Sequence, residues 1–202
     1  MLTTVYFATN RAVTGPAGDW RSYGTDIVAP SDPGVIAYAT AFVDNTNLTA
    51  DKTGAITAIQ NVQRGGFSSQ AITDLSDPGR NLLVFIHGFD NSFDNAITRS
   101  AFNREWFAQS GMAEADTTVV AFTWPSLGQL LSFPLPWEDY QHDQTMAGQS
   151  GFHLMTFSPT CCRSCSRRAR TEAVSFCWLT AWGIGRYRLR SKAGSATATA
   201  MR

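Results

Sequence analysis

The first 157 residues contain no cysteine, and the 45 residues after them contain no histidine. No apolar run approaches the roughly 18–20 residues that a membrane-spanning helix needs. The segment Met1–Arg11 lacks the basic and then apolar order of a secretory signal. Charged residues are few, at 16%, whereas aromatic residues reach 12%, a balance that excludes intrinsic disorder. These absences predict a globular, cytoplasmic protein that neither spans a membrane nor is secreted.

The net charge of zero hides two parts of opposite sign. Residues 1–157 carry 15 acidic and 7 basic side chains, a net charge of −8, whereas residues 158–202 carry 1 acidic and 9 basic side chains, a net charge of +8. The second part also holds all the cysteines, namely Cys161, Cys162, Cys165 and Cys177. We therefore predict a partial domain over residues 1–157, followed by a basic, Cys/Arg-rich and poorly ordered tail over residues 158–202.

The spacing of apolar residues in the first part predicts an α/β fold. Residues 82–86 are five apolar residues in a row, which is typical of a strand buried on both faces of a parallel sheet. The other predicted elements are strands at residues 4–9, 34–43 and 117–123, helices at 93–109 and 138–157, and a loop-rich stretch at 45–79 with room for a short strand. This alternation predicts a mostly parallel sheet with helices on both faces.

A turn that joins the buried strand to the first helix is the candidate site. His87, Gly88 and Phe89 follow the strand directly, where backbone N–H groups lie at the mouth of the sheet beside a helix N-terminus. Such amides stabilise an oxyanion, and one oxyanion donor of α/β-hydrolases lies on the loop after the third strand. We predict that the amide of Phe89 is a donor, that Gly88 permits close approach and that His87 shapes the turn. An ordinary strand-to-helix turn is the alternative.

Three ordered motifs resemble a bacterial α/β-hydrolase family of largely uncharacterised function. They are VYFATNR at residues 5–11, LLVFIHGFDNSFDNA at 82–96 and AFTWPSLG at 121–128. A Tyr-x-x-Asp pair of that family is matched by Tyr140 and Asp143. The resemblance covers residues 1–157. It implies an esterase-like serine hydrolase acting on a small ester-like substrate, with no metal and no organic cofactor.

The catalytic residues of such a hydrolase cannot be found in this sequence. The family pattern requires a small-x-Ser-x-Gly nucleophile elbow after a fifth strand, followed by an acid and a histidine, and residues 158–202 contain neither an elbow nor a histidine. Ser126 lacks the small flanking residues of an elbow. His142 and His153 are predicted to be surface or packing residues. The aspartates of this region are predicted to cap helices or to face solvent, namely Asp90, Asp94, Asp139 and Asp143.

A shifted reading frame restores the missing elbow. Read from the third base of each codon, residues 176–183 permit the string Leu-Leu-Ala-His-Ser-Met-Gly, in which the genetic code forces both leucines and the glycine. This string is the end of a buried strand followed by a nucleophile elbow. We therefore hypothesise that the residues after about Phe157 are an out-of-frame translation and that the chain is inactive.

The basic tail has other interpretations. Its arginines suit phosphate binding, so a non-enzymatic protein that binds nucleic acid or a membrane surface is the alternative function. Nucleic-acid binding is disfavoured because no helical pattern or base-stacking platform accompanies the charge. A zinc site is disfavoured because only Cys162 and Cys165 have ligand spacing. The substrate and the oligomeric state stay open.

Overall fold

The structure, a computed structural model, describes the backbone of residues 1–46, 53–77, 79–109, 117–128, 136–168, 174–180, 183–192 and 195–201. The strands are β1 (Leu2–Thr9), β2 (Arg11–Val13), β3 (Tyr23–Ile27), β4 (Ala37–Asp44), β5 (Ala55–Arg64), β6 (Asn81–Ile86), β7 (Thr117–Thr123), β8 (Val174–Thr180), β9 (Gly183–Lys192) and β10 (Ser195–Met201). The helices are α1 (Ser69–Ser76), α2 (Phe93–Gln109) and α3 (Pro136–Arg168), with short 3₁₀ turns at Trp20–Ser22 and Pro33–Val35.

The main sheet has four parallel strands at its centre. Over the described residues its order is β10-β9-β8-β6-β7-β1-β4-β5, and β8, β6, β7 and β1 run parallel to one another. Val84 of β6 lies beside Val120 of β7, and Val119 lies beside Val5 of β1. The outer strands are antiparallel on both sides. The predicted α/β class, with a parallel sheet between helices, is confirmed.

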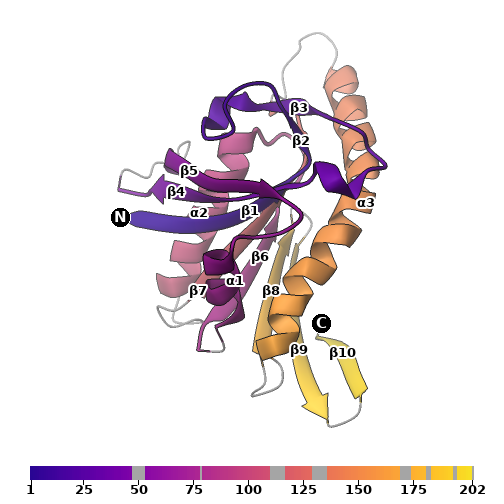
Figure 1. Cartoon of the computed structure of the whole chain (residues 1–202). Coiled ribbons are helices and arrows are strands. Elements are labelled where there is room, and N and C mark those ends of the chain that lie inside the picture. Colours follow the sequence, from indigo (N-terminus) through magenta and orange to yellow (C-terminus); the bar gives the residue numbers. More distant parts are fainter. Residues whose placement is uncertain are drawn as a thin grey trace.

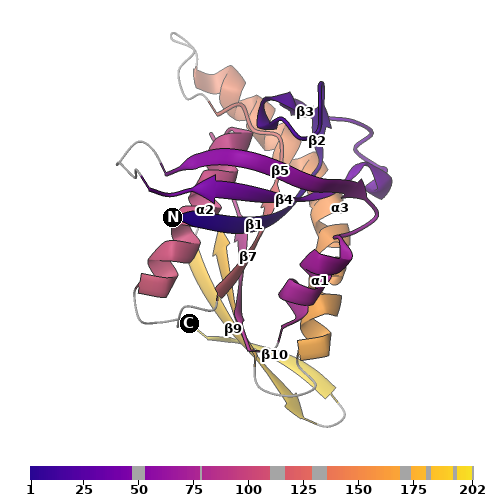
Figure 2. The ribbon, with the colours of Figure 1, turned by 60° about the vertical axis from the view of Figure 1, so that its left-hand side comes forward.

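The two faces of the sheet are covered by different helices, as Figure 2 shows. Leu82 and Val84 of β6 point to the face that packs against α1 and α3, where Phe157 is fully buried. Leu83 and Phe85 point to the other face, which α2 covers. Alternate residues of one strand therefore enter two cores, which explains why residues 82–86 are apolar without interruption.

The prediction of a loop-rich stretch over residues 45–79 is wrong in extent. It contains the ten-residue strand β5 and the helix α1. β5 is an edge strand that pairs antiparallel with β4, and most of its residues are exposed or half-buried. A strand in that position needs few apolar residues, so its sequence lacks the run that marks a central strand.

The tail supplies the strand that follows α3. The helix continues past Phe157 to Arg168, and β8 then pairs in parallel with β6, with Phe176 beside Leu82 and Thr180 beside Ile86. β9 and β10 extend the sheet beyond β8, at the edge opposite β5 (Figure 1). The predicted poor order of residues 158–202 stays a prediction.

Candidate functional site

The order of the strands reverses at β6, which marks a crevice at the carboxyl edge of the sheet. The chain passes from β6 through α2 to β7 on one side, and then returns through α3 to β8 on the other side (Figure 1). The two connecting helices cover opposite faces. Ligands of open α/β sheets bind at such a reversal, outside the carboxyl ends of the strands. The loop that begins at His87 and the segment that begins at Trp124 both lie there.

His87 is held in place by both of its ring nitrogens. Its Nε2 accepts the backbone N–H of Trp124 at 3.0 Å, and its Nδ1 lies 2.8 Å from the carbonyl oxygen of Gly88, so the proton is assigned to Nδ1. The ring stacks on the Trp124 indole, whose Nε1–H donates to the His87 carbonyl at 2.8 Å. Burial, aided by the charge of Arg11, lowers the pKa of His87 to about 3. A neutral imidazole with both nitrogens engaged fixes the turn and is unavailable as a base.

The backbone N–H groups of residues 88–91, which follow His87, form two pairs that differ in whether they have an acceptor. Among the described residues, the N–H groups of Gly88 and Phe89 have no acceptor. The N–H groups of Asp90 and Asn91 are anchored, to Asp143 Oδ2 and to Ser126 Oγ respectively, each at 3.0 Å. The loop is thus fixed directly after Gly88 and Phe89, the two residues of the predicted oxyanion hole, of which Phe89 is the predicted donor. Their role in catalysis stays a prediction.

Asp143 is the buried anchor of this loop, so its predicted place on a solvated face is wrong. Only 4% of the residue is exposed. Its carboxylate accepts the Ser126 hydroxyl at 2.5 Å and the amides of Asp90 and Leu127 at 3.0 Å each. Asp90 adopts a left-handed backbone, with φ of 59°, in the segment that presents its amide to this carboxylate. Three donors compensate the buried charge, which is the condition under which proteins bury a carboxylate.

Arg11, the first residue of β2, joins the same cluster. It is 4% exposed and donates to the carbonyl oxygens of Asn91 at 2.8 Å, Gly24 at 3.0 Å and Ser126 at 3.3 Å. Its Nε also donates to Thr123 Oγ1 at 3.0 Å. Burial lowers the pKa of Arg11 to about 9, an effect that the carboxylate of Asp143 opposes, so the guanidinium is charged at neutral pH.

Four separate sequence motifs therefore meet in one buried polar cluster. ATNR supplies Arg11, the HGF loop supplies Asn91, the WPS segment supplies Ser126 and the Tyr-x-x-Asp pair supplies Asp143. Sequence reasoning missed this cluster. The position of Arg11, a charged residue just after the predicted strand at residues 4–9, was a signal that could have indicated it. Ser126 is fully buried, so a substrate cannot reach its hydroxyl, which instead joins Asn91 to Asp143.

The remaining histidines have structural contacts. His153 is fully buried, with Nδ1 3.0 Å from Asn10 Nδ2 and Nε2 3.1 Å from the carbonyl oxygen of Asp32. This agrees with the prediction of a packing residue. His142 lies at the rim of the buried cluster, with Nδ1 3.5 Å from Asp143 Oδ1.

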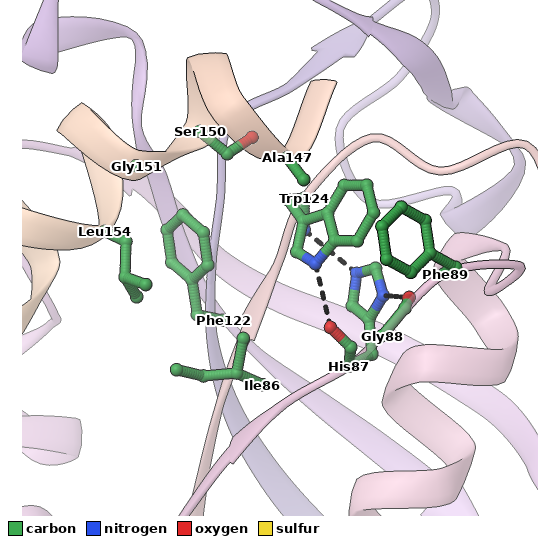
Figure 3. A pocket seen from close by; sticks show the side chains of 10 residues that line it. All are labelled: Ile86, His87, Gly88, Phe89, Phe122, Trp124, Ala147, Ser150, Gly151 and Leu154. Carbon is green, nitrogen blue, oxygen red and sulfur yellow. Dashed lines mark hydrogen bonds between the residues drawn. The ribbon is translucent and has the colours of Figure 1, made fainter. Parts of the chain in front are cut away.

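A pocket lies between the strand ends and α3, and we call it the α3 pocket (Figure 3). Its volume is about 310 Å³. It is lined by Ile86, His87, Gly88, Phe89, Phe122, Trp124, Ala147, Ser150, Gly151 and Leu154. The pocket reaches the loop with the predicted oxyanion amides, and most of its lining is apolar, as is usual for a small-molecule site.

Neither a metal centre nor a membrane span emerges from the part of the chain that the structure describes. Within it, no three His, Cys, Asp or Glu side chains are grouped so that they could hold a metal ion. The four cysteines of the tail lie outside the residues whose side chains are described. None of the described helices is long and apolar enough to cross a membrane.

Fold and site together resemble those of an α/β-hydrolase domain. Residues 65–163 match the family described as "Alpha/beta hydrolase of unknown function (DUF900)". The resemblance deduced from the motifs is thereby confirmed over this segment, which contains the HGF loop, the WPS segment and Asp143. No curated protein and no solved structure matches the chain.

Proposed function

We propose that residues 1–157 are the first part of an esterase-like serine hydrolase and that the chain as written is catalytically inactive. The carrying observation is the absence of a serine from the residues directly after β8. In this fold the nucleophile stands on the sharp turn after the strand beside the one that bears the oxyanion loop. β8 occupies that place beside β6, and the residues that follow Thr180 are Ala181, Trp182 and Gly183.

The chemistry that the chain retains is half of an acyl-transfer site. The free amides of Gly88 and Phe89 suit the negative oxygen that forms when a nucleophile attacks an ester carbonyl. The nucleophile and its activating base account for most of the rate acceleration of a serine hydrolase. Neither His87 nor His153 can serve as that base, because the ring nitrogens of each are held by neighbouring groups in the interior.

We also propose that the residues after about Phe157 are translated out of frame. Three observations support this proposal. The family match ends at residue 163, close to the change in composition. The shifted frame of residues 176–183 permits a strand followed by an elbow, with two leucines and the glycine forced by the genetic code. The strand β8, at Val174–Thr180, lies where that fold needs its elbow-bearing strand.

Reading the DNA across codons 155–185 tests the frame directly. We expect that one of the two alternative frames encodes Ala-His-Ser-Met-Gly, followed by a continuous sequence with an acid and a histidine. If no frame encodes that string, the out-of-frame proposal is wrong. The proposal that the present chain is inactive would then rest only on the residues that the chain itself contains.

The second candidate function is binding of a polyanion by the tail. A net charge of +8 over residues 158–202 favours it. The test is the affinity of the full chain for duplex DNA and for anionic vesicles at 50 and at 200 mM salt. A specific polyanion site predicts affinity that falls steeply with salt for one of these two partners, whereas a tail without function predicts weak binding to both.

A further inference from the structure

The α3 pocket has apolar walls and carries no ionised side chain. Ile86, Phe122 and Leu154 line it together with Trp124 (Figure 3). The one titratable residue in its lining, His87, is neutral at physiological pH because burial lowers its pKa to about 3. Burying an ion in such surroundings is costly, so the pocket favours a neutral molecule. At roughly 30 Å³ per water-sized group, it has room for about ten such groups.

Ser150 contributes a hydroxyl to the lining of the pocket. Its neighbours determine whether this hydroxyl can donate or accept a hydrogen bond there. Its Oγ accepts a hydrogen bond from Asn10 Nδ2 at 2.9 Å. The same amide nitrogen lies 3.0 Å from His153 Nδ1, whose other nitrogen is 3.1 Å from the carbonyl oxygen of Asp32. That carbonyl can only accept, so the imidazole proton lies on Nε2 and Nδ1 accepts from Asn10. Asn10 therefore presents both of its N–H groups, one to His153 and one to Ser150.

This relay leaves the hydrogen of the Ser150 hydroxyl available for donation. One lone pair of its oxygen is engaged by Asn10, and among the described residues its own hydrogen has no acceptor. The residue is only 3% exposed, and it lines the pocket on the α3 side, across from Ile86 and His87 (Figure 3). A buried hydroxyl whose hydrogen lacks a partner is a costly group unless a ligand accepts from it.

We propose that the α3 pocket binds a small neutral molecule with an apolar body and one hydrogen-bond acceptor, such as an aryl or short alkyl ketone or ester. The apolar body lies against Phe122, Trp124 and Leu154, and the acceptor receives the hydrogen of Ser150. This binding needs no nucleophile. It therefore goes beyond the proposed hydrolase ancestry, and its failure would leave that proposal standing.

The acceptor is tested with two ligands of nearly equal shape. Acetophenone carries a carbonyl oxygen, and ethylbenzene lacks it. Ligand-observed NMR titration of the full chain measures the affinity of each for the original chain, for Ser150→Ala and for the control Thr145→Ala, which lies exposed on the same helix. We expect Ser150→Ala to weaken acetophenone about five- to tenfold and to leave ethylbenzene unchanged. Equal effects on both ligands, or no binding of either by the original chain, would overturn the proposal.

A matched pair of glycines on α3 tests whether the ligand binds in the α3 pocket. A Cβ added at Gly151 or at Gly148 meets no heavy atom within 4 Å, so both accept a side chain, but only Gly151 lines the pocket. Replacing a helical glycine also favours the helix in both cases. We expect Gly151→Leu to abolish binding of both ligands and Gly148→Leu to retain it. Undiminished binding by Gly151→Leu would place the ligand elsewhere and refute the site.

Discussion

At the scale of the residue, the site is built on buried polar groups that stabilise the HGF loop. His87, Arg11 and Asp143 are each at least 95% buried, and each is satisfied by backbone groups of the loops that it joins. Removing one of these residues is costly because an unpaired buried polar group costs about 1–3 kcal/mol, and a charged group costs more. Their loss is therefore visible in stability even where no activity remains to be measured.

The buried neutral state of His87 predicts a pH dependence of stability. The native imidazole takes up a proton only near pH 3, whereas an unfolded histidine does so near its ordinary pKa of 6.5. Between these values the unfolded state binds the additional proton, so the free energy of unfolding falls as the pH falls, by at most about 1.4 kcal/mol per pH unit. Urea denaturation at several pH values should show a shallower decline for His87→Gln below pH 6.5 and parallel curves above pH 7. Parallel curves throughout would contradict a buried neutral His87.

The carboxylate of Asp143 predicts a large loss of stability on truncation. Asp143→Ala leaves the Ser126 hydroxyl and the amides of Asp90 and Leu127 without their acceptor. We expect a decrease of about 3 kcal/mol in the free energy of unfolding. Asp26→Ala is the control, because that side chain is 78% exposed and its removal should change stability by less than about 0.5 kcal/mol. A similar small change in both variants would show that the buried cluster contributes little.

At the scale of the element, the segment after β7 is pressed against the first turn of α2. Gly128 has a φ of +67°, and a Cβ there would lie 2.5 Å from the backbone nitrogen of Ser92 and 2.9 Å from its Cα. Ser92 precedes α2, and its hydroxyl lies 3.3 Å from the amide of Asn95, which caps the helix. The WPS segment and the helix after the HGF loop can therefore approach only because residue 128 lacks a side chain.

This close approach is tested with two glycines that share a left-handed backbone. Gly65 has a φ of +82°, but nothing lies within 4 Å of its added Cβ. Gly65→Ala should cost about 1 kcal/mol of stability from the backbone alone, whereas Gly128→Ala should cost about 3 kcal/mol because the backbone of Ser92 must also shift. Chemical denaturation of both variants measures the two losses of stability. An equal loss of stability would mean that the contact with Ser92 adds nothing to the cost of a side chain at residue 128.

Element order was largely predictable from the sequence, and the partners of polar residues were not. The apolar run at residues 82–86 identifies a central strand because two cores demand apolar residues on both faces. The edge strand β5 carries no such demand and was predicted as loop. Asp143 illustrates the second limit, since a single aspartate on a helix reads as solvated until the backbone amides of two distant loops are seen to converge on it.

At the scale of the whole molecule, one sheet combines strands from two parts of the chain that differ in composition. The part with a net charge of −8 supplies the HGF loop and its buried anchors, and the part with a net charge of +8 supplies β8, β9 and β10. The central proposal is that the chain holds the frame of a serine hydrolase without its nucleophile. This proposal concerns the whole chain, because the HGF loop and β8, the strand proposed to precede the nucleophile, come from opposite sides of the change in composition.

Labelling of the purified full chain with a serine-directed fluorophosphonate tests this claim most directly, with intact mass spectrometry as the readout. The probe reports an activated serine wherever it lies, and labelling of the heat-denatured chain gives the background. We predict no adduct above that background after prolonged incubation. Stoichiometric labelling of one serine in the folded chain would contradict the account, and the labelled peptide would identify the nucleophile.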